Sequence, residues 1–137
     1  MMDSMDKNFI FKTKAYYEDT DAGGIVYYAN YLKFFERART EWIYSLGLKH
    51  NILNEKNIFI VVKSCQIDFV KPVKFEEEID IVTKLTKLSP VRITMLQSAH
   101  VSGEDRVKGI VELAIIDGSG KPIKMPEHWL DLFKSCI

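Results

Sequence analysis

The sequence predicts one domain of the α+β class, in which a five-stranded antiparallel sheet wraps around one long central helix. Three observations lead to this prediction: an alternating segment near the N-terminus, a long stretch with helical periodicity, and four later segments rich in β-branched residues. A chain of 137 residues is long enough to bury about two-thirds of its unfolded surface around a single core. We therefore expect residues 1–137 to form a single domain.

The first half of the chain contains one expected strand and the long helix. Apolar side chains alternate with lysines over residues 8–17, which is the period of a half-buried strand. Residues 19–24 are expected to turn, since Asp and Gly tolerate the backbone angles of turns. Over residues 31–46 large apolar side chains recur every three or four positions, which predicts an amphipathic helix packed against the sheet. Gly47 is placed to end this helix in a left-handed conformation.

After a polar connector over residues 49–57, four strands are expected to follow one another as a meander. Their expected ranges are 58–70, 75–88, 91–101 and 106–116, and a short terminal helix is expected over 125–134. Turn signals such as Ser89-Pro90 and Ser102-Gly103 separate the strands. A sheet that covers the helix with one face leaves another face or edge unprotected, so we expect the chain to dimerise.

Composition argues against several classes of protein. Nineteen basic and nineteen acidic side chains cancel, so no overall field favours nucleic acid or an anionic membrane. No apolar run approaches the roughly 20 residues of a transmembrane segment, and the first seven residues lack the apolar region of a secretory signal. Cys65 and Cys136 form no CxxC motif, which favours reduced, packed thiols and a cytoplasmic location.

Residues 19–31, with the sequence DTDAGGIVYYANY, place two aspartates and a Gly-Gly pair just before the long helix. A carboxylate in this position is stabilised by the helix dipole and by unpaired backbone N–H groups. A turn or capping role is the ordinary alternative for both aspartates, and Asp19 fits it well. The Gly-Gly pair and the aromatic residues that follow favour a catalytic role for Asp21.

Gly23 and Gly24 are consistent with a tight turn, and their missing side chains would also let a substrate carbonyl approach the backbone. Free N–H groups at the start of the helix could then form an oxyanion hole, in which one donor contributes about 10²–10³ in rate. The rings of Tyr27, Tyr28 and Tyr31 fit either packing positions or the walls of an acyl pocket. These residues are candidates for substrate binding.

Lys87 and Arg92 flank the Ser89-Pro90 turn. A solvated basic edge is one interpretation, because lysine and arginine are rarely buried. The other is a clamp for the phosphates of a coenzyme tail, because cations at a loop attract multivalent anions. Both residues are therefore candidate substrate-binding residues.

Other types of active site have little support in the sequence. His50, His100 and His128 show no metal-ligand spacing, so we expect surface or hydrogen-bonded histidines and no metal site. A GxSxG nucleophile elbow, a P-loop and a Rossmann fingerprint are all missing from the sequence.

Residues 17–31, together with FERARTE at 35–41, resemble the signature of the 4-hydroxybenzoyl-CoA thioesterase branch of the hot-dog superfamily. Within that branch they are most similar to the bacterial Tol–Pal-associated acyl-CoA thioesterases. The resemblance implies a hot-dog fold, homodimers or homotetramers with active sites at subunit interfaces, and hydrolysis of acyl-CoA or acyl-carrier-protein thioesters. It implies no metal and no cofactor, because coenzyme A is part of the substrate.

The resemblance also assigns roles to residues. Asp21 matches the catalytic carboxylate, as nucleophile or general base, and the backbone N–H of Tyr28 matches the donor that polarises the thioester carbonyl. The Tol–Pal-associated group commonly has histidine where this chain has Tyr28, whereas the 4-hydroxybenzoyl-CoA enzymes have tyrosine. The backbone donor survives that change, but a histidine proton relay does not.

Two other functions remain as alternatives. The first is a non-catalytic protein of lipid metabolism that binds acyl thioesters or acyl-carrier protein. The second is hot-dog dehydratase or hydratase chemistry, which usually needs an Asp/His pair associated with the helix. Residues 28–46 contain no such pair.

Overall fold

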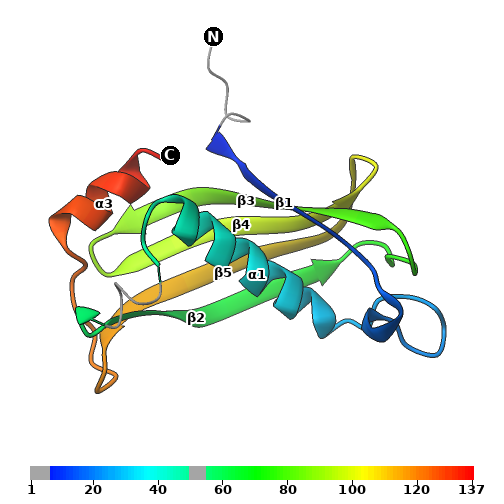
Figure 1. The fold of residues 1–137 in the computed structure, drawn as a ribbon, viewed down its shortest axis with the longest axis horizontal. Coiled ribbons are helices and arrows are strands. Elements are labelled where there is room, and N and C mark those ends of the chain that lie inside the picture. The colour runs from blue at the N-terminus through cyan, green and yellow to red at the C-terminus, as the bar shows by residue number, and fades with distance from the viewer. Residues whose placement is uncertain (1–6, 50–54) are drawn as a thin grey trace, which may run out of the picture.

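The computed structural model describes residues 7–49 and 55–137, in which a single sheet packs against one long helix (Figure 1). The helix α1 (Asn30–Ser45) lies across one face of the sheet, and a short helix α3 (Glu127–Lys134) lies near one end. The five antiparallel strands are β1 (Phe9–Lys14), β2 (Ile58–Phe69), β3 (Glu78–Ser89), β4 (Arg92–Val101) and β5 (Glu104–Asp117). The predicted fold class is confirmed.

The strand order is β1-β3-β4-β5-β2, so the prediction of a four-stranded meander is wrong. Only β3, β4 and β5 follow one another as neighbours. Strand β2 pairs instead with β5, with Ile58 opposite Asp117 and Phe69 opposite Val107. The reason is the connection 70–77, which crosses the end of the sheet from β2 to β3 and is not a tight hairpin. Strands β1 and β2 are therefore the two edges.

The buried face of α1 carries the residues that the helical periodicity selected. These are Tyr31, Phe34, Phe35, Ala38 and Trp42; Ile43 is buried as well, and the predicted Leu46 follows the helix and is half-buried. Gly109 on β5 allows the close approach of α1, because a Cβ at this position would lie 3.0 Å from the Phe35 ring. The helix is followed by Gly47 with a φ of 89°, which confirms the predicted left-handed end.

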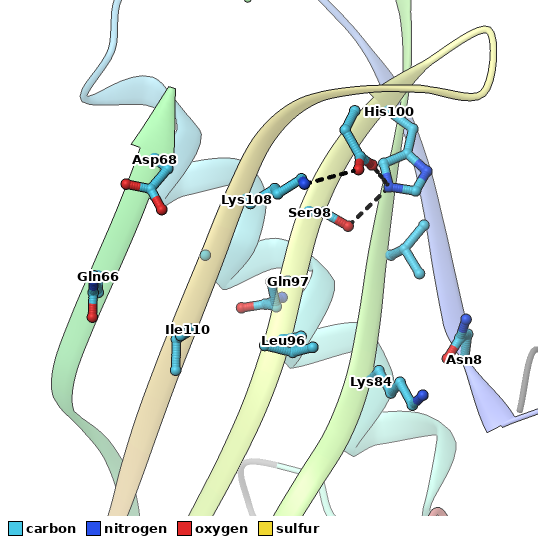
Figure 2. A pocket seen from close by; sticks show the side chains of 13 residues that line it. Asn8, Gln66, Asp68, Lys84, Leu96, Gln97, Ser98, His100, Lys108 and Ile110 are labelled. Atoms are coloured by element: carbon cyan, nitrogen blue, oxygen red, sulfur yellow. Dashed lines mark hydrogen bonds and ion pairs between the residues drawn. The ribbon is translucent and has the colours of Figure 1, made fainter. Parts of the chain in front are cut away.

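The other face of the sheet, which we call the outer face, is not covered within the described residues. Along β4 the buried Met95, Gln97 and Ala99 alternate with outward-facing neighbours. Leu96 on β4 and Ile110 on β5 are 44% and 47% exposed there. A hollow of about 500 Å³ lies on this face (Figure 2).

Both cysteines are free thiols, but Cys65 is exposed and not packed as predicted. It lies on β2, an edge strand with no further strand beside it in the described chain, so most of the strand is open to solvent. In the part of the chain that the structure describes, we find no helix with both the length and the apolar content to cross a membrane.

Candidate active site

The candidate site is built on the loop between the short helix η2 (Tyr17–Asp19) and α1. This loop, residues 20–29, folds back on itself: the Asp21 N–H donates to the Ile25 carbonyl at 2.9 Å, and the Gly24 N–H donates to the Asp21 carbonyl at 3.0 Å. Gly24 has a φ of 77°, a conformation that glycine adopts without strain. The Gly-Gly pair therefore forms the tight turn that its sequence suggested.

The two aspartates of the motif lie in different environments. Asp19 is 9% exposed, and its Oδ2 accepts the Tyr16 N–H at 2.9 Å. Its carbonyl accepts the Tyr27 N–H and the side-chain amide of Asn30, both at 2.9 Å. Asp19 therefore fixes the entry to the helix, in agreement with the structural role expected for it.

Asp21 is exposed, and its carboxylate bonds within its own loop. Oδ1 accepts the Gly23 N–H at 2.8 Å, and a side chain at Gly23 would crowd it, because a Cβ there would lie 3.3 Å from Oδ1. Among the described residues Oδ2 has no hydrogen-bond partner. One carboxylate oxygen is thus oriented and the other is accessible to a ligand or a water.

Tyr28 lies two residues before the first residue of α1, in the turn that leads into the helix. The Asn30 N–H donates to the Tyr27 carbonyl at 2.9 Å, and the Tyr31 N–H donates to the Tyr28 carbonyl at 3.4 Å. The Tyr28 N–H itself has no acceptor within residues 7–49 and 55–137. It is one of the unpaired donors that a helix start provides for negative charge.

A pocket of about 200 Å³ lies beside Tyr28. Its walls come from the loop, from the start of α1 and from the end of β2, and they include Ile25, Tyr28, Tyr31 and Phe69. The Phe69 ring lies 6.1 Å from the Tyr28 ring and 5.8 Å from the Tyr31 ring. Burial raises the pKa of the Tyr31 phenol, so this ring is a neutral wall.

Two details of the pocket differ from what the sequence suggested. Phe69 was missed, because an aromatic residue at the end of a predicted strand carries no local signal that relates it to the Asp21 loop. Tyr27 does not line the pocket but packs on Tyr28, with ring centroids 4.8 Å apart. The neighbouring Tyr28 phenol raises the pKa of the Tyr27 phenol.

Lys87 and Arg92 lie at the opposite end of the sheet from the Asp21 loop. Lys87 is near the end of β3, whereas the Asp21 loop contacts the connection before the start of that strand. Nine residues of extended strand span roughly 30 Å, so one chain does not bring Lys87 to Asp21. Arg92 lies 3.5 Å from Glu112 in a partly exposed ion pair. A site that combines both ends therefore needs a second chain.

The outer-face hollow contains a serine, a histidine and an aspartate, the residue types of a hydrolytic relay. Figure 2 shows Ser98 and an acidic partner directed at His100. Ser98 Oγ lies 3.0 Å from His100 Nε2, and Asp105 Oδ1 lies 2.6 Å from the same nitrogen. A relay needs the two partners on opposite ring nitrogens, so this group is not a relay.

His100 is thus a hydrogen-bonded histidine, as predicted, and His128 is an exposed residue of α3. His50 lies outside the described residues. Across residues 7–49 and 55–137 no three potential metal-ligating side chains come together.

Comparison with known proteins identifies the family. The model of the thioesterase-like superfamily matches residues 17–133. The chain belongs to this superfamily. The acyl-CoA thioesterase YbgC of Haemophilus influenzae is 36% identical over 126 residues, which are 90% of this chain and 93% of that protein.

Solved structures of the superfamily show the same fold. A probable thioesterase from Bartonella henselae superposes with a TM-score of 0.83 and 33% identity, over 87% of this chain and 99% of that one. The DHNA-CoA thioesterase from Staphylococcus aureus superposes with a TM-score of 0.86 and 26% identity, over 93% and 89%. The hot-dog fold implied by the motif is therefore confirmed.

Proposed function

We propose that this protein is an acyl-CoA thioesterase, which hydrolyses a thioester to a free acid and coenzyme A. The proposal rests on one observation: the loop before α1 carries both an exposed Asp21 carboxylate and a Tyr28 N–H that has no acceptor among the described residues. Membership of the thioesterase-like superfamily and the names of its relatives support it.

Asp21 acts on the thioester in one of two ways. As a nucleophile, a carboxylate oxygen attacks the carbonyl carbon, the coenzyme A thiolate leaves, and water hydrolyses the mixed anhydride. As a general base, Asp21 takes a proton from a water that attacks the same carbon, and the thiolate leaves as the tetrahedral intermediate collapses. Both routes need one accessible carboxylate oxygen, and Oδ2 of Asp21 meets this need.

The Tyr28 N–H stabilises the oxyanion that forms in either route, and the dipole of α1 adds to its effect. Gly23 and Gly24 leave room for the carbonyl to approach the loop. The rings of Tyr31 and Phe69 form the wall of the acyl pocket, and Tyr27 supports this wall through Tyr28. In this mechanism the enzyme uses no metal and no cofactor.

A complete site in this proposal contains two protomers. Edge strand β2 exposes Val61, Val62 and Phe69, at 37%, 48% and 51%, so it is the surface at which we propose that a second copy pairs. Lys87 and Arg92 of the second protomer would then bind the phosphates of coenzyme A. The same pairing produces a homodimer, and the homotetramer that the motif also allows would need a second interface. The proposed location is the cytoplasm.

The branch of the superfamily is also part of the proposal. Similarity to proteins named YbgC supports the branch that contains the Tol–Pal-associated thioesterases. Tyr28 is the residue that the motif shares with the 4-hydroxybenzoyl-CoA enzymes, so aromatic acyl groups belong among the substrates to be tested.

Thiol release from short, medium, long and aromatic acyl-CoAs, and from acyl-carrier proteins, tests the proposed function. We expect release of free thiol from at least one acyl-CoA class. Binding of acyl-CoA in calorimetry without any release would favour the non-catalytic thioester-binding protein. Release from carrier-protein thioesters alone would correct the substrate and keep the reaction.

A further inference from the structure

A buried arginine, Arg106 near the start of β5, holds together the end of the sheet that carries the candidate site. It is 9% exposed. Its Nη1 and Nη2 donate to the two carboxylate oxygens of Glu77 at 3.1 and 3.3 Å, which is a bidentate pair. Nη1 also donates to the Pro72 carbonyl at 2.7 Å, and Nε donates to Glu104 at 2.6 Å. The guanidinium therefore binds two residues of the connection 70–77 and one residue of its own strand at once.

These contacts fix the connection 70–77 between β2 and β3. At its start, the Val70 and Lys71 N–H groups donate to the Arg106 carbonyl at 2.9 and 3.0 Å. At its end, Glu77 is held by the guanidinium and accepts the Lys74 N–H at 2.8 Å. Arg106 lowers the pKa of Glu77, so this carboxylate stays charged and paired at neutral pH. One residue thus anchors both ends of the connection.

The Asp21 loop rests on this same connection. The Val26 N–H donates to the Val73 carbonyl at 2.8 Å, and the Phe75 N–H donates to the Gly24 carbonyl at 3.1 Å. The Asp21 carboxylate bonds within its own loop, and these two backbone bonds tie that loop to the connection. A shift of the connection would therefore move the carboxylate.

We propose that Arg106 is a positioning residue for thioester hydrolysis, which holds the connection 70–77 and thereby orients Asp21 toward the substrate. This inference rests on the proposed function. Arg106 is directed at Glu77, Pro72 and Glu104 and acts through them. A lysine would not replace it, because one ammonium group lacks the planar fork that holds these acceptors together.

Arg106→Lys in the full chain tests the inference, with Lys108→Met as the matched control. Lys108 lies two residues further along β5 and pairs with Asp105 at 3.5 Å on the exposed side of the strand. Misplacement of a catalytic group by about 1 Å can cost on the order of 10²-fold in rate. We expect kcat of Arg106→Lys to fall about 10- to 100-fold with KM nearly unchanged, and Lys108→Met to match the wild type.

Hydrogen exchange gives a readout that does not depend on turnover. In Arg106→Lys the amides of Val26 and Phe75 should exchange faster. Val26 donates to Val73 on the loosened connection, and Phe75 belongs to that connection. Lys108→Met should leave these amides unchanged. Wild-type exchange together with wild-type kcat in Arg106→Lys would overturn the inference.

The double variant Asp21→Asn/Arg106→Lys separates positioning from general stability. If Arg106 acts through Asp21, the residual rate of Asp21→Asn should not fall further, whereas an independent effect would multiply. A multiplied effect therefore overturns the inference. An active Asp21→Asn variant would instead refute the role given to Asp21 in the proposed function.

Glu77→Gln provides the same test if Arg106→Lys does not fold. It keeps the shape of the side chain and removes the charge that pairs with Arg106. We expect a smaller fall in kcat with the same faster exchange at Val26. Unchanged kcat and unchanged exchange in Glu77→Gln would contradict the inference.

Discussion

The two ends of the sheet hold their polar residues in different ways. At one end an exposed carboxylate, Asp21, lies on a loop that rests on the buried contacts of Arg106. At the other end Lys87 and Arg92 flank a hairpin turn, and Arg92 lies 3.5 Å from Glu112 in a partly exposed ion pair. Exposed ion pairs contribute about 0–1 kcal/mol and leave side chains free to move. Chemistry that needs fixed geometry therefore fits the first end, and loose attraction of anions fits the second.

The largest expected effect is at the first end. Asp21→Asn should lower kcat by about 10²–10⁴-fold, because it removes the acid–base or nucleophilic group. Its melting temperature should stay close to that of the wild type, since the exposed asparagine can still accept the Gly23 N–H. Steady-state thiol release and thermal unfolding measure the two quantities. The control is Glu18→Gln, an exposed acid in η2, which should keep wild-type activity.

A pair of glycine variants compares the two ends directly. Gly24 and Gly120 have φ values of 77° and 88°, and a Cβ at either would meet nothing within 4 Å. Alanine in this conformation costs about 1–2 kcal/mol, so both variants should lose similar stability in denaturant unfolding. Only Gly24→Ala should also lower kcat, by about tenfold, because relief of the strained φ would shift the carbonyl that accepts the Phe75 N–H and with it the Asp21 loop. Equal kcat values in the two variants would contradict the division between the ends.

Substitutions at the second end should have smaller effects than those at the first, and they should act on substrate binding. Lys87→Gln and Arg92→Gln should each raise KM for acyl-CoA by about two- to fivefold, because each removes an exposed charge near the coenzyme phosphates. The effect should shrink as salt is added, and kcat should not change. Identical KM values at low salt would favour the alternative that these side chains form only a solvated basic edge.

The smallest effect concerns acid pH. Arg106 lowers the pKa of Glu77 and of Glu104 in the folded protein. The stability that these pairs contribute is therefore fully present above the ordinary carboxyl pKa of about 4.3 and is lost as pH falls through the lowered folded values. Urea unfolding of wild type and Glu77→Gln between pH 6 and pH 3 should show the difference between them shrink at the acid end. A difference that is constant over this range would show that the pair does not titrate as described.

The sequence predicted the elements well because their signals are local. The stripe from Tyr31 to Trp42 and the alternation along β4 follow from which side chains each element buries. Strand order was not predictable in the same way, since it depends on the path of residues 70–77. That path is fixed by Arg106, about thirty residues further along the chain.

The residues of the candidate site also differ in whether the sequence could predict them. Asp21, Gly24 and Tyr28 belong to one continuous motif, so the sequence brought them together. Phe69 and Arg106 carry only the ordinary signals of strand residues, and nothing local relates them to the loop. The packing at the end of the sheet shows that Phe69 lines the pocket and that Arg106 holds the connection on which the Asp21 loop rests.

The central claim is that Asp21 performs the chemistry, and single-turnover hydrolysis with enzyme in excess over one acyl-CoA tests it most directly. This measurement separates the chemical step from binding and product release. Asp21→Asn should lower the saturating rate by about 10²–10⁴-fold, while the enzyme concentration at half-saturation stays near the wild-type value. A saturating rate close to that of the wild type, or a loss found only in binding, would contradict the claim.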